Sequence, residues 1–214
     1  MSLIEKYIRM YEEDFIFEYS THISGKILDI EIEIDVYEYN DQYNHREKAQ
    51  VTLKKGDLKY ECEFCDRHKY ADGFYPIMLN GQQFICFSKT IYGFVFMNAD
   101  TLTVEYEYFP QCVVEEGESF EESFIIVDVK QLGDIFIFKG CYWAAPYESF
   151  AFDYSKKLFL NLSQYFGPCH SGKTAIKGDE LIMYGTDEAY SKKQVTVSKQ
   201  EISDALNKFG KSFF

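Results

Sequence analysis

The feature that most constrains the fold is a repeated order of turns and short strands. It begins at Gly81, again at Gly133 and a third time at Gly178, so the copies lie roughly 45 to 55 residues apart. One such meander buries too little apolar surface to be stable alone, so we expect the copies to pack against one another. The matched positions of the first two copies are Phe94, Phe96 and Leu102 with Phe150, Phe152 and Leu158.

The composition also favours strands. Aromatic residues make up 18% of the 214-residue chain, mostly as 20 Phe and 18 Tyr, and such rings pack well on a pleated, half-buried surface. We therefore predict a mainly β fold of antiparallel meander repeats in a small propeller-like array, with a β-sandwich as the alternative. Short helices are expected at both ends, because Ser2 with Glu5 and Ser198 with Glu201 have capping-box spacing.

A resemblance supports the repeat interpretation. The segment GDIFIFKGCYWAAPYESFAFDYS, residues 133–155, resembles one found in uncharacterised proteins with propeller-like β repeats. In those proteins a G-C-Y-W-A-x-P-Y-E connection joins two blade strands. The resemblance covers at most about a quarter of the chain, and it implies a fold but no activity.

Domain organisation is expected to be simple, because no Pro-, Gly- or Ser-rich linker interrupts the chain. We predict a single domain over residues 1–214. Within it we expect an N-terminal helix and acidic hairpin region over 1–75, β repeats over 76–197 and a C-terminal helix over 198–214.

An acidic strand is predicted in ILDIEIEIDVYEY, where apolar residues from Leu28 to Val36 alternate with acids. Carboxylates two residues apart on a strand are about 6.6 Å apart, too far for neighbours to chelate one ion directly. We expect a solvated face that lysines of KAQVTLKK partly neutralise across the sheet, or alternatively a docking surface for a basic protein. The candidate docking residues are Asp29, Glu31, Glu33 and Asp35.

The segment GPCHSGKT, from Gly167 to Thr174, matches the phosphate-binding pattern G-x-x-x-x-G-K-[ST]. That chemistry requires a helix directly after the lysine, whose terminal N–H groups bind phosphate. Only three residues separate Thr174 from the next predicted turn at Gly178, so we predict a loop between repeats with a solvated lysine. Nucleotide binding is the alternative, through Gly167, Gly172, Lys173 and Thr174.

The connection CYWAAPYE is the best candidate for a ligand site. It holds the only Trp of the chain and ends in a carboxylate, so aromatic faces could provide contact area while the acid orients a polar group. The alternative is that the rings pack between repeats. The candidate residues are Tyr142, Trp143, Tyr147 and Glu148.

The spacing of Cys62, Cys65 and His68 is similar to that of a zinc knuckle. A structural zinc site also needs a second ligand pair, and two cysteines three positions apart on one strand point to opposite faces. We therefore expect no metal and no cofactor.

The net charge of −13 repels polyanions, so we expect neither nucleic acid nor membrane as a partner. A basic protein or a small ligand fits this charge better. The first residues lack the pattern of a secretory signal, so a cytoplasmic location with mostly reduced cysteines is expected. The predicted function is a non-enzymatic binding or protein-interaction module, with nucleotide binding or an unrecognised hydrolase as alternatives.

Overall fold

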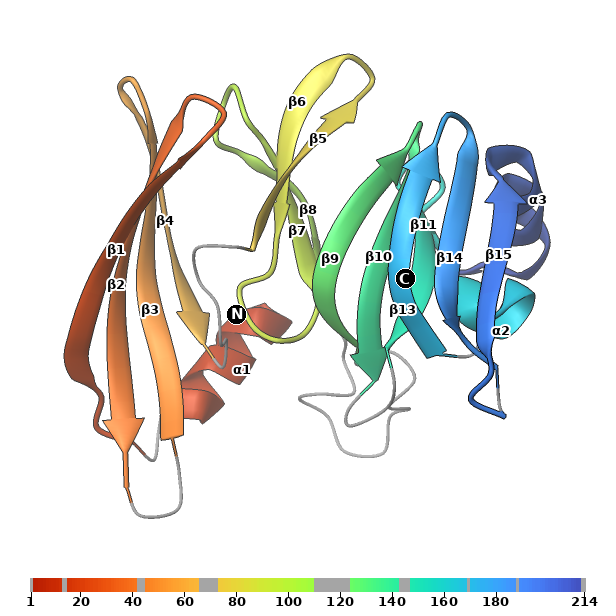
Figure 1. The fold of residues 1–214 in the computed structure, drawn as a ribbon. Coiled ribbons are helices and arrows are strands. Elements are labelled where there is room, and N and C mark those ends of the chain that lie inside the picture. Colours follow the sequence, from red (N-terminus) through yellow and green to blue (C-terminus); the bar gives the residue numbers. More distant parts are fainter. Residues whose placement is uncertain are drawn as a thin grey trace. The chain divides into compact units, whose positions relative to one another are not determined.

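The structure, a computed structural model, describes residues 2–12, 15–41, 45–65, 73–109, 124–142, 147–168, 170–187 and 189–212. Figure 1 shows a mainly β fold in which consecutive strands form antiparallel sheets. The chain forms two compact units, residues 1–123 and 124–214. The predicted fold of antiparallel meanders with short terminal helices is confirmed. The helices of the described residues are α1 Leu3–Glu12, α2 Leu162–Phe166 and α3 Lys199–Phe209.

The first unit contains two sheets of four strands each, both built as meanders in which every strand pairs with the next one. The strands of the first sheet are β1 Glu18–Ile27, β2 Ile30–Asn40, β3 His45–Lys55 and β4 Leu58–Cys65. The strands of the second sheet are β5 Phe74–Leu79, β6 Gln82–Phe87, β7 Phe94–Asn98 and β8 Val104–Tyr108.

These two sheets share one core. Every second residue of β2, from Ile30 to Val36, is buried, and these side chains belong to the same cluster as Ile85 of β6 and Met97 of β7. Burial of each such side chain stabilises the fold by about 1.5–3 kcal/mol. The alternation in the sequence therefore gives the first sheet one buried face and one outer face.

The second unit repeats this plan. One sheet has the order β16-β12-β11-β10-β9, and the other has the order β13-β14-β15. Their shared core includes Ile137 of β10, Met183 of β14 and Ile202 of α3. The strands are β9 Phe124–Leu132, β10 Ile135–Tyr142, β11 Glu148–Asp153, β12 Leu158–Asn161, β13 His170–Lys177, β14 Glu180–Thr186, β15 Lys192–Ser198 and β16 Lys211–Ser212.

The repeats start one strand earlier than predicted. Gly81, Gly133 and Gly178 each lie between the first and second strands of a meander, with φ of 77°, 66° and 59°. The first sheet is a fourth meander, which the sequence conceals because Leu28, with φ 54°, occupies the equivalent turn. Glycine is favoured at such positions because it adopts a positive φ without steric cost.

Two boundaries differ from prediction. The predicted limit at residues 75 and 76 falls inside β5, whereas the first sheet ends at Cys65. The predicted β repeats over 76–197 are interrupted after Asn161, whose side chain accepts a hydrogen bond from the Gln164 N–H and caps the short helix α2. The single domain over residues 1–214 stays a prediction.

The turn after β11 depends on one buried carboxylate. Asp153 accepts hydrogen bonds from the Ser155 hydroxyl at 2.7 Å and the Lys156 N–H at 3.1 Å. Burial raises the pKa of Asp153, but these hydrogen bonds outweigh it and hold the pKa below its usual value. The ionised form is therefore the one that stabilises this turn.

We predict that Asp153→Ala lowers the free energy of unfolding at pH 7 by about 1–3 kcal/mol, because two donors lose their acceptor. Since the folded-state pKa is depressed, this contribution is present above about pH 4 and is lost as the pH falls through the folded-state value. Urea unfolding at pH 7 and pH 3 tests both points. Asp57→Ala, in an exposed turn, is the control, and an equal effect of the two variants would contradict this assignment.

Candidate functional site

The outer face of the β1–β4 sheet carries an acidic band. The strand register places Glu33 opposite Thr52, which in turn lies opposite Glu61. In the next row on this face, Asp35 and Glu63 lie on either side of the same strand β3. The four carboxylates of Glu33, Asp35, Glu61 and Glu63 form what we call the acidic band.

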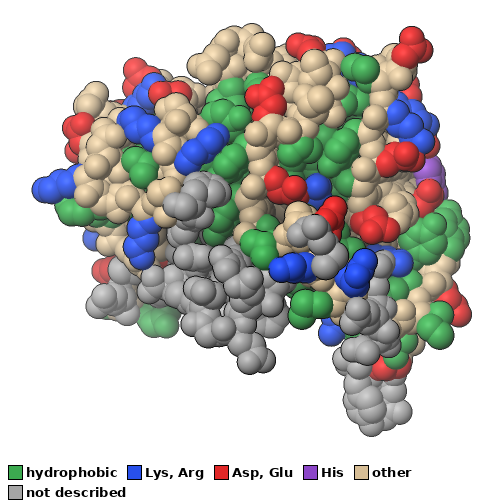
Figure 2. All heavy atoms as spheres, turned by 180° about the vertical axis from the view of Figure 1, so that it is seen from behind, with side chains coloured by type: hydrophobic (Ala, Val, Ile, Leu, Met, Phe, Trp, Pro, Cys, Tyr) green, Lys and Arg blue, Asp and Glu red, His purple; other side chains and the backbone are tan. Residues whose placement is uncertain are grey.

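A row of basic residues borders this band. Glu31 lies between Lys26 of β1 and Lys54 of β3, and Lys54 lies opposite Lys59. Charges of both signs therefore share this face, as the sequence predicts for the acidic strand and the lysines of β3. Figure 2 shows acidic and basic side chains interspersed over the surface that is seen from behind the view of Figure 1.

Exposed ion pairs and hydrogen bonds contact the carboxylates of the band without burying them. Lys54 Nζ lies 3.7 Å from Glu33, Lys59 Nζ lies 2.7 Å from Glu61, and His22 Nδ1 lies 2.8 Å from Asp35. Gln50 donates a hydrogen bond to Glu63. Exposed pairs of this kind contribute only about 0–1 kcal/mol each, so an incoming cation can replace them at little cost.

Asp29 does not belong to this face. It lies in the turn between β1 and β2, next to Leu28, which is 39% exposed rather than inward as predicted. Its carboxylate lies 3.1 Å from Lys55, whose hydrogen bond lowers the pKa of Asp29, and Lys55 also pairs with Asp100 at 2.8 Å. The strict alternation in ILDIEIEID extends the predicted strand through a turn that contains no glycine.

Sequence reasoning also missed Glu61 and Glu63 as parts of the acidic band. The signal was present in LKYECEF, where acids alternate with apolar residues in phase with the acids of β2. Recognising this signal requires the pairing register of β2, β3 and β4, which the sequence alone does not give.

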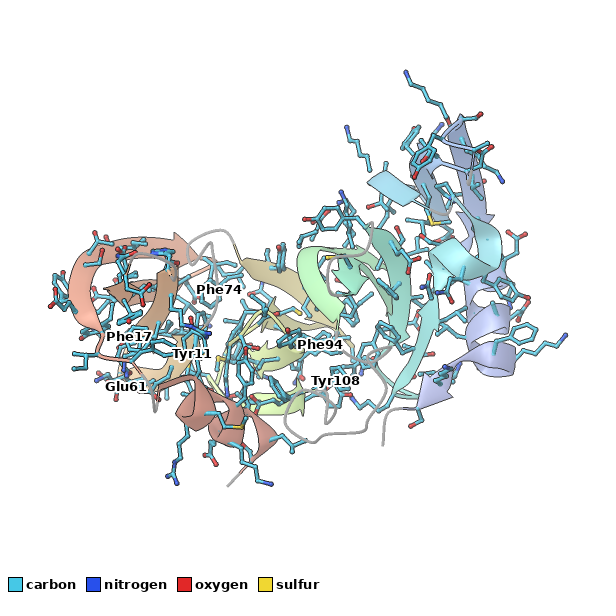
Figure 3. The ribbon with its side chains drawn as sticks, turned by 90° about the horizontal axis from the view of Figure 1, so that it is seen from below. Tyr11, Phe17, Glu61, Phe74, Phe94 and Tyr108 are labelled. Carbon is cyan, nitrogen blue, oxygen red and sulfur yellow. The ribbon has the colours of Figure 1, made fainter. Side chains whose placement is uncertain are left out.

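Aromatic side chains continue the same face beyond the band. Tyr19 contacts Tyr37 with ring centroids 5.9 Å apart, and Lys48 lies 5.0 Å from the centroid of Phe17. Tyr11 of α1 packs on Phe17 with ring centroids 6.0 Å apart (Figure 3). Tyr19 is 60% exposed, so this aromatic end offers apolar surface beside the charges.

The segment GPCHSGKT has no phosphate-binding geometry in its described residues. His170–Lys177 forms strand β13, paired antiparallel with β14, so the predicted loop is wrong for these residues. Lys173 is exposed, whereas Thr174 is only 4% exposed and lies inside the strand. Gly167 ends α2, Gly172 is exposed within β13, and Cys169 lies outside the described residues.

The aromatic connection is only partly described. Tyr142 is the last residue of β10, and Trp143 lies outside the described residues. Tyr147 is exposed, with Lys139 Nζ 5.0 Å from its ring centroid, whereas the Glu148 carboxylate accepts a hydrogen bond from Asn161. These two side chains have separate partners, and a ligand site here stays a prediction.

Lys139 links this connection to the phosphate-pattern segment. Its ammonium donates a hydrogen bond to the Gly172 carbonyl while it lies over the Tyr147 ring. These two motifs, far apart in the sequence, therefore lie close to each other in the second unit. The Lys139 ammonium therefore has a hydrogen-bond acceptor on β13.

The cysteine pair lies in β4. Cys62 and Cys65 are three positions apart on this strand, and Cys65 is buried while Cys62 packs on the core between the two sheets. His68 lies outside the described residues. Among the residues that the structure describes, no three His, Cys, Asp or Glu side chains are grouped as metal ligands. No described helix is long and apolar enough to cross a membrane.

A further polar pair, missed from the sequence, lies inside the first unit. Lys89 Nζ lies 2.8 Å from Glu107 of β8, and their side chains are 12% and 27% exposed. Burial alone would lower the pKa of Lys89, but the Glu107 carboxylate outweighs it and holds this pKa above its usual value. Burial also raises the pKa of Tyr60, which lies near this lysine. Only tertiary structure brings Lys89 and Glu107 together, so no local pattern indicates the pair.

We predict that Lys89→Met lowers the free energy of unfolding by about 2–3 kcal/mol, because Glu107 is left partly buried without its counter-charge. Adding Glu107→Gln should restore part of this loss. Urea unfolding measures both. The matched control is Lys59→Met, which removes an exposed pair and should cost no more than about 1 kcal/mol. Equal losses for the two lysines would show that the Lys89 pair is effectively solvated.

We predict that neither ATP nor GTP with magnesium stabilises the protein, because β13 provides no helix terminus behind Lys173. A bound nucleotide at a hundredfold excess over its Kd would add about 2.7 kcal/mol, which a thermal-shift assay detects easily. Lys173→Ala serves as the control. A nucleotide shift in the wild type that disappears in this variant would reinstate the phosphate site.

Comparison with known proteins gives little similarity. No protein-family model matches the chain, and no curated protein matches it. Among solved structures, the chain is similar to one titled "Crystal structure of HIRA(644-1017)", with 9% sequence identity and a TM-score of 0.37. The match covers 87% of this chain and 56% of that chain, so this chain spans little more than half of the matched structure. A similarity this weak carries no argument about function.

Proposed function

We propose that this protein is a non-enzymatic protein-interaction module that binds a positively charged segment of a partner on the outer face of the β1–β4 sheet. The observation that carries the proposal is the acidic band, in which two strands place four carboxylates in adjacent rows of one outward face. Side chains between them, those of Thr52 and Gln50, are uncharged. A partner could therefore meet several carboxylates at once.

The distribution of charge along the chain supports this proposal. Residues 1–123 contain 25 acidic and 11 basic side chains, a formal net charge of −14. Residues 124–214 contain 10 acidic and 11 basic side chains, a net charge of +1. The negative charge thus belongs to the unit that carries the acidic band, where it would accelerate association with a basic partner.

The spacing of the band favours a protein over a single ion. Successive carboxylates on one strand are about 6.6 Å apart. The strands β2 and β4, which lie on either side of β3, are about 9–10 Å apart. This spacing exceeds the distance across which two carboxylates bind one ion. It suits several lysine or arginine side chains of one partner segment, each of which can meet its own carboxylate.

The aromatic end would add apolar contact. Exposed aromatic side chains are frequent energetic anchors in protein interfaces, and Tyr19 is exposed at the end of the charged face. We therefore infer a partner segment that combines basic residues with at least one apolar side chain. We propose that the protein acts in the cytoplasm. We also propose, from the sequence of residues 133–155, that it is related to the propeller-like repeat proteins.

The proposal is tested with a purified partner. Affinity capture identifies candidates, and titration calorimetry then measures their Kd for the wild type and for Glu33→Lys/Glu61→Lys. We predict that this variant binds at least about tenfold more weakly, a loss of about 1.4 kcal/mol, and that added salt weakens wild-type binding. The control Glu18→Lys/Asp57→Lys makes the same change in net charge at exposed positions outside the band. Equal weakening by both variants, or by neither, would refute docking on this face.

A further inference from the structure

The β13–β15 sheet has one strand fewer than the first two sheets. Its order is β13-β14-β15, and among the described residues no strand pairs with the second edge of β15. Figure 1 shows β15 as the last strand of this sheet. Four of its seven residues are exposed, namely Lys192, Lys193, Gln194 and Thr196. An exposed edge presents unpaired backbone groups to which another strand can bind.

The sequence of β15 nearly repeats that of β3. Residues 48–55 read KAQVTLKK and residues 192–199 read KKQVTVSK, identical at five of eight positions. Both strands are the third of their meander, and both turn Val51 or Val195 toward a core. The identical pairs are Lys48 and Lys192, Gln50 and Gln194, Val51 and Val195, Thr52 and Thr196, and Lys55 and Lys199.

The chain continues differently after each of these two strands. After β3 it turns at Gly56 and returns as β4 along the second edge of β3. After β15 the side chain of Ser198 accepts a hydrogen bond from the Glu201 N–H, and this capping box starts α3 instead. The buried side chains of α3, including Ile202 and Leu206, belong to the core. The strand β15 therefore has the sequence of a central strand but the position of an edge strand.

The fourth strands of the first unit show what such an edge accepts. In β4, Glu61 and Glu63 alternate with apolar side chains, and Glu63 lies opposite Gln50, which donates a hydrogen bond to it. In β8, Glu105 and Glu107 alternate with Val104 and tyrosines in the same way. Carboxylates alternating with aromatic or aliphatic residues are thus the pattern of both fourth strands of the first unit, whereas β12, the fourth strand of the β9–β12 meander, reads LFLN and carries no carboxylate.

We propose that the edge of β15 binds an extended segment of a partner protein in which acidic residues alternate with apolar ones, added as the fourth strand of this sheet. Backbone hydrogen bonds would supply affinity, and the alternating side chains would supply specificity. A glutamate of the segment would meet Gln194, as Glu63 meets Gln50. Lys192, which lies on the same face as Gln194, would attract its carboxylates, and the exposed Lys193 would add positive charge at this end of the strand.

This inference goes beyond the proposed function, because it concerns the other unit and a partner segment of opposite charge. The probe is a peptide with the sequence of Leu58–Phe64 carrying Cys62→Ser, since β4 is the strand that β3 accepts. Titration into the full protein, monitored by amide NMR shifts, should place the peptide on residues 192–198. The same peptide with Glu61→Lys and Glu63→Lys should bind at least about tenfold more weakly.

Variants of the protein distinguish strand addition at β15 from a general electrostatic attraction to the second unit. We predict that Lys192→Glu/Lys193→Glu weakens binding of the acidic peptide at least about tenfold. Lys173→Glu/Lys177→Glu makes the same charge change on β13 of the same sheet and should weaken it less than about threefold. Circular dichroism checks that both variants are folded.

Several outcomes would overturn the proposal. Equal weakening by the two lysine variants, shifts that map away from β15, or no binding of the acidic peptide would each do so. A dimer that dissociates with Lys192→Glu/Lys193→Glu would also overturn it, because a second copy of this chain would then be the occupant. None of these results bears on the acidic band, whose variants lie in the first unit.

Discussion

Face-to-face packing of meander sheets is the interaction on which the rest of this structure depends. A single antiparallel meander has one apolar face, and that face is stable only when another sheet covers it. In the first unit the alternate residues of β2 share a core with β6 and β7, and in the second unit Ile137 shares one with Met183. Each unit is therefore the smallest arrangement that buries the apolar face of both of its sheets.

The same alternation determines what the surface can do. Because successive side chains of a strand point to opposite faces, burial of Ile32 and Ile34 forces Glu33 outward. The register then aligns acids from β2 and β4 into one band, although these strands are separated in the sequence by β3. The acidic band is thus a direct consequence of core formation.

Sequence reasoning succeeded where a local pattern decides the structure. Alternation predicted β2 and β3, and the spacing of Ser198 and Glu201 predicted the start of α3. It failed where tertiary context decides. A turn at Leu28 has no glycine to mark it, and GPCHSGKT becomes a strand from His170 because β14 pairs with it. The acidic band also escaped full prediction, since Glu61 joins it only through the register of three strands.

The pair β3 and β15 shows how closely related sequences can acquire different surroundings in one chain. Lys-x-Gln-Val-Thr gives both strands the same inward valine and the same outward polar residues, so the strand itself is determined locally. Its neighbour is determined by the next few residues, because Gly56 permits a tight return whereas Ser198 caps a helix. A helix cap placed at the end of a third strand prevents the chain from supplying its own fourth strand. Among the described residues it leaves β15 at the edge of its sheet, and the proposed partner strand is based on β4, the strand that pairs with β3.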